Sequence, residues 1–227
     1  MEKLTEAFEM LMSMDRELLQ IIGVTLRMSF FSTLISCLIG MPLGVLLGKG
    51  SFKGKGTIVK LTGTFMGLPP VVAGLIVYML FSKNGIFGSM GLLFTVEIMV
   101  IAQCMLIIPV VINLTNSITR VNASPLLETT KGLNFSRSKT ALLMLTENKT
   151  ALFSVVLTAF GRSIAEVGAV SLVGGNIQWK TRVMTTAIML ETNKGNFEFA
   201  LALGIVLLII SFAVNILASL LSKEDEQ

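Results

Sequence analysis

Histidine is absent from this chain of 227 residues, and charged residues make up only 14% of it. The lack of histidine removes the commonest general base and the commonest metal ligand. The sequence also lacks the Gly-x-x-x-x-Gly-Lys-Ser/Thr pattern of a phosphate-binding loop, and no cluster of carboxylates resembles a metal site. The sequence therefore predicts neither an enzyme nor an ATPase, and it predicts no cofactor and no metal ion.

Cysteine is scarce as well. Cys37 and Cys104 both lie in apolar stretches, where a small core side chain is more typical than half of a disulfide. The two residues therefore say nothing about the redox compartment.

What is abundant is apolar sequence. Hydrophobic residues make up 53% of the chain and the mean hydropathy is +0.80, which excludes an ordinary soluble domain. A helix needs about 20 consecutive apolar residues to span a bilayer. The segments that meet or approach this length are 21–47, 58–81, 92–114, 151–173 and 199–221. We therefore expect an all-α integral membrane protein, with about five transmembrane helices in one domain over 21–221, an outer segment at 1–20 and a tail at 222–227.

The positions of lysine and arginine predict the topology, because loops rich in these residues stay on the cytoplasmic side. Lysines at 49, 53, 55 and 60 flank the first connection, and residues 120–150 are also basic. Both regions fall on one side if the amino terminus lies outside and the carboxyl terminus in the cytoplasm. We interpret the pI of about 9.2 as this topology signal, since no soluble domain remains to bind nucleic acid. The expected location is the cell (plasma or inner) membrane, with several passes.

Small residues recur at intervals of four in two predicted spans: Gly40, Gly44 and Gly48 in the first, and Gly161, Ala165 and Ala169 in the fourth. Helices in lipid associate where small residues allow their backbones to approach. We therefore interpret both sets as packing stripes.

The second span contains the pair Pro69-Pro70. Two adjacent prolines remove two backbone donors and must kink or break a helix. Non-helical backbone at membrane depth is tolerated only where it faces protein or a watery cavity. The pair therefore predicts either a wall or gate of a translocation path, or a plain kink.

Two charged residues, Arg162 and Glu166, lie near the middle of the fourth span. A lone charge at the bilayer centre costs ~2.5–3.5 kcal/mol on insertion scales, so each is expected to face a partner or water. Their spacing of four would put them on one helix face, where they can neutralise each other. Structural pairing and a gate whose pairing changes are both open.

Residues 125–150 form a polar insert between the third and fourth spans. We expect two short helices: Ser124-Pro125 is a start signal, Asn134 suits the left-handed conformation that ends a helix, and Ser136 can cap the second helix. That second helix would carry its apolar residues on one side (Ala141, Leu142, Leu143 and Leu145). A basic helical hairpin of this kind, with apolar residues on one side, is a docking surface for another protein.

A polar loop follows the fourth span. Gly174, Gly175 and Asn176 could present backbone N–H groups as a nest for an anion, and Thr181 could cap a short helix ending near Gly195. A simple turn at the membrane surface explains the same residues.

The insert resembles the EAA loop of the membrane subunits of ABC importers. Glu128-Thr129-Thr130 stands in for the Glu-Ala-Ala triplet, Asn134 occupies the glycine position, and the closing Leu-Pro falls on Thr146-Glu147, so that half is missing. The resemblance implies that a cytoplasmic ATPase grips this region. The residues that it assigns to ATPase coupling are Glu128, Thr129, Thr130, Lys131, Gly132, Leu133 and Asn134.

Other stretches make the resemblance closer, and it then covers nearly the whole chain. They are 67–72 (Gly-Leu-Pro-Pro-Val-Val), 91–95, 160–162 with 165–169, and 174–177 with 181–188. These look like the oxyanion-importer permeases, with tungstate permeases nearest and molybdate permeases second, of the type I (MetI-like) fold. The resemblance implies a homodimer in the lipid membrane, two ATPase subunits and an extracytoplasmic oxyanion-binding protein.

The candidate functional residues are therefore of three kinds. The path or gate is assigned to Pro69, Pro70, Arg162 and Glu166; the loop that faces the binding protein is assigned to Gly174, Gly175, Asn176, Thr181 and Arg182. Scattered hydroxyls and one arginine are too few for a tight anion cage, so we expect discrimination between oxyanions to lie mainly in the delivering protein.

The sequence argues against two other classes of function. An ion-coupled secondary transporter usually has internal repeats with broken helices at matching positions, whereas this sequence predicts a break only at Pro69-Pro70 and an odd number of spans. Co-purification with an ATPase subunit would distinguish the two. An intramembrane enzyme using Arg162 and Glu166 would lack a nucleophile beside a base.

Overall fold

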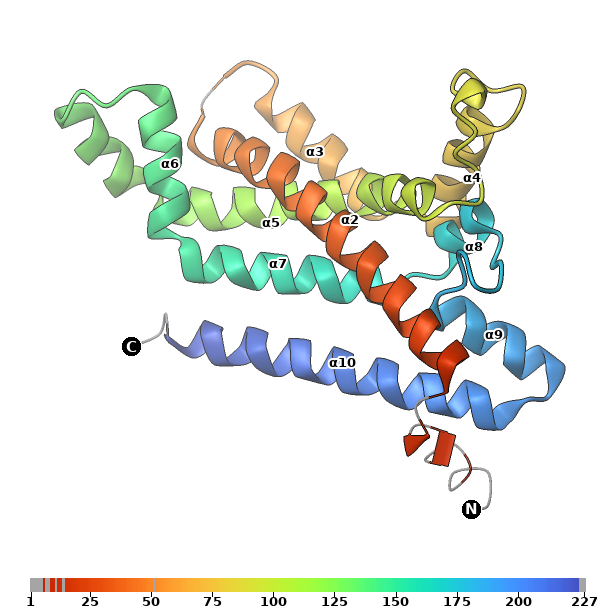
Figure 1. Cartoon of the computed structure of the whole chain (residues 1–227). Coiled ribbons are helices and arrows are strands. Elements are labelled where there is room, and N and C mark those ends of the chain that lie inside the picture. Colours follow the sequence, from red (N-terminus) through yellow and green to blue (C-terminus); the bar gives the residue numbers. More distant parts are fainter. Residues whose placement is uncertain (1–5, 7–8, 11, 14, 51, 225–227) are drawn as a thin grey trace. The chain divides into compact units, whose positions relative to one another are not determined.

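The computed structural model describes residues 6, 9–10, 12–13, 15–50 and 52–224, and this part of the chain is helical without strands (Figure 1). The expected all-α class is confirmed. The main helices are α2 (Arg16–Lys49), α3 (Lys55–Met66), α4 (Pro70–Phe81), α5 (Val96–Gly132), α6 (Arg137–Glu147), α7 (Lys149–Ile164), α8 (Gly168–Gly174), α9 (Met184–Lys194) and α10 (Phe197–Glu224), with a 3₁₀ turn, η1, at Gly88–Met90. Of the predicted outer segment at 1–20, residues 1–5, 7–8, 11 and 14 lie outside the described residues, and 16–20 already belong to α2. The side chains of the predicted tail at 222–227 also lie outside what is described.

The membrane-spanning candidates agree with the predicted number. Among the described residues, three stretches are long and apolar enough to cross a membrane (Arg16–Lys49, Val96–Val121 and Phe197–Leu220), and there are up to five if each of two bent helix pairs counts as one span. These pairs are α3 with α4, and most of α6 with α7.

The chain divides into two compact units, each built from several separate segments. Unit 1 comprises Met1–Ser32, Pro69–Gln103 and Gly161–Val214; unit 2 comprises Thr33–Leu68, Cys104–Phe160 and Asn215–Gln227. The core of unit 1 joins α2, α9 and α10 through Leu18, Ile21, Met184, Ala187, Phe199, Ala202 and Leu203. The core of unit 2 joins α2, α5 and α7 through Cys37, Ile107, Val111, Val155 and Ala159.

The glycine stripe of the first span is confirmed as a packing surface in unit 2. A Cβ added to Gly40 would lie 2.8 Å from the Cβ of Val111, and one added to Gly48 would lie 2.6 Å from the Cβ of Thr119. Gly44 meets Thr115 in the same way. The residue numbers of the contacting pairs increase together along both helices, so α2 and α5 run parallel here. Their carboxyl ends therefore lie at the same end of the pair.

The predicted break at the proline pair is confirmed. Helix α3 ends at Met66, Pro69 is the extended residue before α4, and Pro70 is the first residue of α4, where a missing N–H costs nothing.

The fourth predicted span differs from the expectation, because it is also broken. Helix α7 ends at Ile164 and α8 begins at Gly168. Arg162 and Glu166 therefore do not share one face of a continuous helix, and the stripe of Gly161, Ala165 and Ala169 is interrupted. The sequence gives no proline here; the break depends on hydrogen bonds from distant residues, described below.

The predicted helix start at Ser124-Pro125 is wrong. Helix α5 continues through both residues to Gly132. A proline inside a helix removes one hydrogen bond, but elongating an existing helix adds one bond for each residue and needs no new nucleus. The third span and the first half of the insert are thus one helix.

Candidate functional site

The last turns of α5, the bend after them and α6 together form what we call the elbow (residues 128–147). Its bend has the local geometry that the sequence predicted. Asn134 has a φ of +56°, and the N–H of Phe135 donates to the carbonyl of Thr130 at 2.9 Å. This is the six-residue bond of a Schellman ending. The side chain of Ser136 then accepts from the N–H of Lys139 at 3.3 Å and caps α6. Both assignments, Asn134 as helix end and Ser136 as cap, are confirmed.

The residues assigned to ATPase coupling occupy the last turns of α5 and this bend. Glu128, Gly132, Leu133 and Asn134 are exposed, whereas Thr130 is buried. The side chains of Thr129 and Lys131 lie outside what the structure describes. The region therefore offers an accessible surface that ends in a fixed turn.

The apolar side of α6 differs from the prediction. Among the apolar residues described in α6, Met144 is the buried one and packs against Val45 of α2, whereas the side chain of Leu142 is 62% exposed. Leu142 and Leu143 cannot both face the same neighbour as Ala141 and Leu145, because a helix turns about 100° at each residue. The exposed Leu142 is therefore available for a contact outside unit 2.

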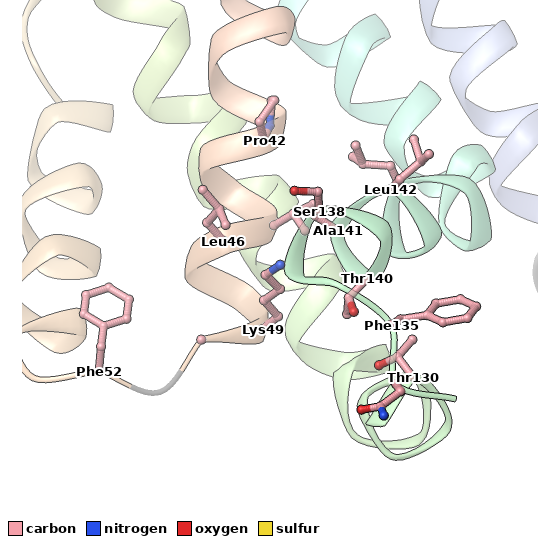
Figure 2. Close-up of a pocket in the computed structure, with 14 residues that line it drawn as sticks. Pro42, Leu46, Lys49, Phe52, Thr130, Phe135, Ser138, Thr140, Ala141 and Leu142 are labelled. Atoms are coloured by element: carbon pink, nitrogen blue, oxygen red, sulfur yellow. The ribbon is translucent and has the colours of Figure 1, made fainter. Parts of the chain in front are cut away.

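An open groove of about 960 Å³ lies between the end of α2 and the elbow, all within unit 2. Figure 2 shows side chains from α2 and the following loop on one wall and those from the elbow on the other. The α2 side contributes Pro42, Val45, Leu46, Lys49, Gly50 and Phe52; the elbow side contributes Thr130, Asn134, Phe135, Ser138, Thr140, Ala141, Leu142 and Leu145. No pattern in the sequence predicts this groove, because its walls are far apart in the chain.

The helix break after α7 is held by side chains from three places in unit 1. The amide nitrogen of Gln103 on α5 donates to the carbonyl of Ser163 at 3.1 Å, and the Ser163 hydroxyl lies 2.8 Å from that of Ser32. The hydroxyl of Thr185 on α9 donates to the carbonyl of Glu166 at 2.8 Å. The bonds from Gln103 and Thr185 go to carbonyl groups that a continuous helix would have paired internally.

The carboxylate of Glu166 satisfies the opposite side of the break. Its Oε1 accepts from the N–H groups of Val167 at 3.0 Å and Ala169 at 3.4 Å, at the start of α8. A negative charge is favourable at such a position, because the first N–H groups of a helix have no partner inside it. Sequence reasoning identified Glu166 and missed Thr185. The polarity of Gln103 within a long apolar segment predicts an interhelical hydrogen bond, and the structure confirms it.

The two helix breaks face each other in unit 1. A Cβ added to Gly168 would lie 2.8 Å from Cγ2 of Val71, and one added to Gly74 would lie 2.7 Å from the Cα of Ala169. The first turns of α4 and α8 are therefore in contact through glycines. The structure thus brings Pro70 close to the break that contains Glu166.

The loop after α8 is closed by its own hydrogen bonds. The Thr181 hydroxyl donates to the carbonyl of Gly174 at 2.6 Å and accepts from the N–H of Ile177 at 3.0 Å. The N–H of Gly175 donates to the carbonyl of Ser171, so that N–H is not free for the anion nest considered from the sequence. Thr181 also does not cap α9, which begins at Met184 after Val183, although the predicted end at Gly195 is confirmed.

The exposed part of this loop is its tip. Thr181 and Arg182 are buried, whereas the side chains of Gln178, Trp179 and Lys180 are exposed. Of the residues assigned to the face for the binding protein, Gly175 is exposed, Asn176 is half-buried and Gly174 is buried. The side chains most available to a partner are therefore ones that the assignment omitted.

An ion-paired network lies beneath this loop and lines a small polar pocket of about 150 Å³. Arg182 donates to the carboxylate of Glu17 on α2 at 3.0 Å, and Lys194 donates to that of Glu191 at 2.8 Å. Burial would raise the pKa of Glu191, but hydrogen bonds from Lys194 and Asn196, with the positive charges of Lys194 and Arg182, lower it overall. The network connects α2, the loop and α9 within unit 1.

Comparison with known proteins gives one matching family and several similar chains. The family model described as "binding-protein-dependent transport system inner membrane component" matches residues 40–224. The chain is 38% identical to a tungstate uptake system permease protein TupB of Peptoclostridium acidaminophilum, over 99% of this chain and all of the relative. It is 41% identical to a protein of the same description in Campylobacter jejuni, over 96% and 91%. It is 35% identical to a probable anion ABC transporter permease protein of Haloferax volcanii, over 89% of both chains.

Proposed function

The chain belongs to the family of binding-protein-dependent transport system inner membrane components, and from this premise we propose that it is the membrane permease subunit of an ATP-driven importer of tungstate. Its two relatives of 38% and 41% identity are tungstate permeases by description and match nearly the full chain. This similarity is the observation that carries the proposal. The subunit performs no chemistry; a separate ATPase hydrolyses ATP, and a binding protein delivers the anion. Molybdate is the alternative substrate.

The elbow is the proposed site of ATPase docking. It supplies exposed residues at the end of α5, and the left-handed Asn134 fixes the angle at which α6 leaves. A rigid turn at the end of a 37-residue helix transmits a displacement better than a flexible loop would. Movement of the ATPase would therefore be carried along α5.

The facing breaks of α4 and α8 are the proposed gate. Broken helices near the middle of a membrane are typical of transport sites. The Glu166 carboxylate is already held by backbone N–H groups, which supports a positioning role for Glu166 in this state. Pro69 and Pro70 end the regular hydrogen bonding of the facing segment.

The loop tip at Gln178, Trp179 and Lys180 is the proposed contact for the binding protein. In this topology the amino terminus lies outside, the elbow and the carboxyl terminus lie in the cytoplasm, and two copies of the chain form the pathway. The parallel packing of α2 and α5 supports placing both basic connections on one side. Few described groups suit a dianion cage, so selectivity is assigned to the binding protein.

The test is oxyanion uptake by cells that express the complete importer, with and without this subunit. Tungstate accumulation that requires the subunit, falls on ATP depletion and exceeds molybdate accumulation at equal concentration supports the proposal. Uptake that survives ATP depletion would assign the protein to ion-coupled transport instead. Preferential accumulation of molybdate would keep the assignment as an importer subunit, but would make molybdate the substrate in place of tungstate.

A further inference from the structure

The groove between α2 and the elbow has two walls with different origins. One wall is the end of a membrane-spanning helix, α2, and the other is the proposed ATPase-docking elbow. We propose that this groove is a socket for an apolar, acid-flanked segment of the ATPase partner, so that α2 as well as α5 receives the motion of the ATPase. The inference rests on the proposed function and extends the docking surface to residues 42–52.

Exposed apolar side chains around the elbow indicate a protein partner. Leu133, Phe135 and Leu142 are 61%, 41% and 62% exposed. Helix α6 also carries Arg137, Lys139 and Glu147 within eleven residues, too many charges for a segment immersed in hydrocarbon. Apolar side chains gathered on a polar element mark a protein contact.

The polar groups in the groove distinguish this partner from a lipid chain. The elbow wall includes the exposed side chains of Asn134 and Ser138 beside its apolar residues. An acyl chain cannot satisfy hydroxyl and amide groups, whereas a peptide segment offers both donors and acceptors. Peptide therefore fits the mixed lining better than hydrocarbon does.

The stretches of sequence that carry the two walls of the groove are basic, and this predicts the character of the segment. In residues 49–60 and 120–150 the sequence has nine cationic residues (Lys49, Lys53, Lys55, Lys60, Arg120, Lys131, Arg137, Lys139 and Lys149) and two acidic ones (Glu128 and Glu147). Lys49 itself lines the groove. Complementary charge requires Asp or Glu beside the apolar residue that enters the groove.

Seating a segment there would act on two helices together. The glycine stripe holds α2 against α5 over Gly40, Gly44 and Gly48 with almost no space between the backbones. Because packed interiors are stiff, a push against the groove wall moves α2 and α5 as a pair.

The test places a photoreactive amino acid at position 46 or at position 43, in the assembled importer in native membranes. Leu46 lines the groove and is 49% exposed; Leu43 lies on the same helix, is 43% exposed and does not line the groove. We expect an adduct with the ATPase from position 46 at a yield about tenfold above that from position 43. Equal yields from the two positions, or an adduct from position 46 with lipid or with a second copy of the chain, would overturn the socket.

A third probe position separates this inference from the proposed function. Leu133 lies in the elbow, directly after the last residue of α5, and does not line the groove. If position 133 labels the ATPase and position 46 does not, only the socket is wrong. If neither position labels it, ATPase docking at the elbow is wrong too.

Filling the groove gives an independent readout. Leu46→Trp should weaken retention of the ATPase on the purified permease about tenfold, which corresponds to ~1.4 kcal/mol, whereas Leu43→Trp should leave it unchanged. Equal retention by both variants, at equal permease recovery, would contradict the socket.

Discussion

Gly44 of α2 and Thr115 of α5 lie in contact, so that a Cβ added to Gly44 would be 2.6 Å from the Cβ of Thr115 and 2.8 Å from the carbonyl oxygen of Ile112. No side chain fits there unless the helices separate. The parallel pairing of α2 with α5, which aligns the two basic connections, depends on this approach.

The first prediction concerns this contact. Gly44→Ala should destabilise the protein by ~1–3 kcal/mol, because overpacking shifts backbone. Gly23→Ala on the same helix is the matched control, since nothing lies within 4 Å of a Cβ there and alanine favours helix over glycine by up to ~1 kcal/mol. Thermal unfolding in detergent should show a lower midpoint for Gly44→Ala alone. Equal midpoints for the two variants would contradict the close approach.

A second prediction concerns coupling at the elbow. Glu128→Lys should lower ATP-driven uptake several-fold, because it reverses a charge on the docking surface. Asn134→Pro should do the same, since proline cannot adopt the φ of +56° at that position. Asn134→Gly is the control: glycine accepts a positive φ and should retain uptake. Membrane levels of each variant must match the wild type. Normal uptake by both Glu128→Lys and Asn134→Pro would remove the docking assignment.

The break after α7 gives a third prediction. Thr185→Val removes the donor to the carbonyl of Glu166 while keeping the shape of the side chain. This bond is half-buried, so its loss should cost no more than the ~1–3 kcal/mol of a buried group left without a partner; the arrangement of the break should change and the uptake rate should fall. Thr192→Val, at an exposed position on the same helix, should have no effect. If the two variants transport tungstate at the same rate, the bond has no role in the gate.

The sequence predicted the local features of the fold better than its distant contacts. The helix end at Asn134, the cap at Ser136, the break at Pro69 and the stripe of glycines all follow from preferences of single residues, and all are present. The break after Ile164 did not follow, because Gln103 and Thr185 hold it from other helices. Continuity of α5 through Pro125 was missed for the opposite reason: a local start signal is overridden when the helix has already begun.

The same distinction applies to the candidate site. The position of the coupling region was predictable from a run of charge and turn residues, whereas the groove was not, since residues 42–52 and 130–145 form it together. In the loop after α8, burial decides which residues are accessible, and it favours Trp179 over Thr181.

A fourth prediction concerns pH. Since the pKa of Glu191 is lowered from its ordinary value of 4.5, the ionised carboxylate contributes stability that is fully present above pH 4.5. This contribution is lost as the pH falls below 4.5 and through the lowered pKa. Glu191→Gln should therefore unfold at a lower temperature than the wild type at pH 7, and the difference should shrink as the pH is lowered below 4.5. A difference that stays constant between pH 7 and pH 3 would contradict the role of the ionised carboxylate.

The most direct test of the account is the side of the membrane on which the elbow lies. Lys139→Cys and Lys180→Cys place an exposed thiol on the elbow and on the loop after α8, while both native cysteines are buried. A membrane-impermeant thiol reagent applied to intact cells should label position 180 and should reach position 139 only after permeabilisation. Labelling of position 139 on intact cells would place the elbow away from any cytoplasmic ATPase.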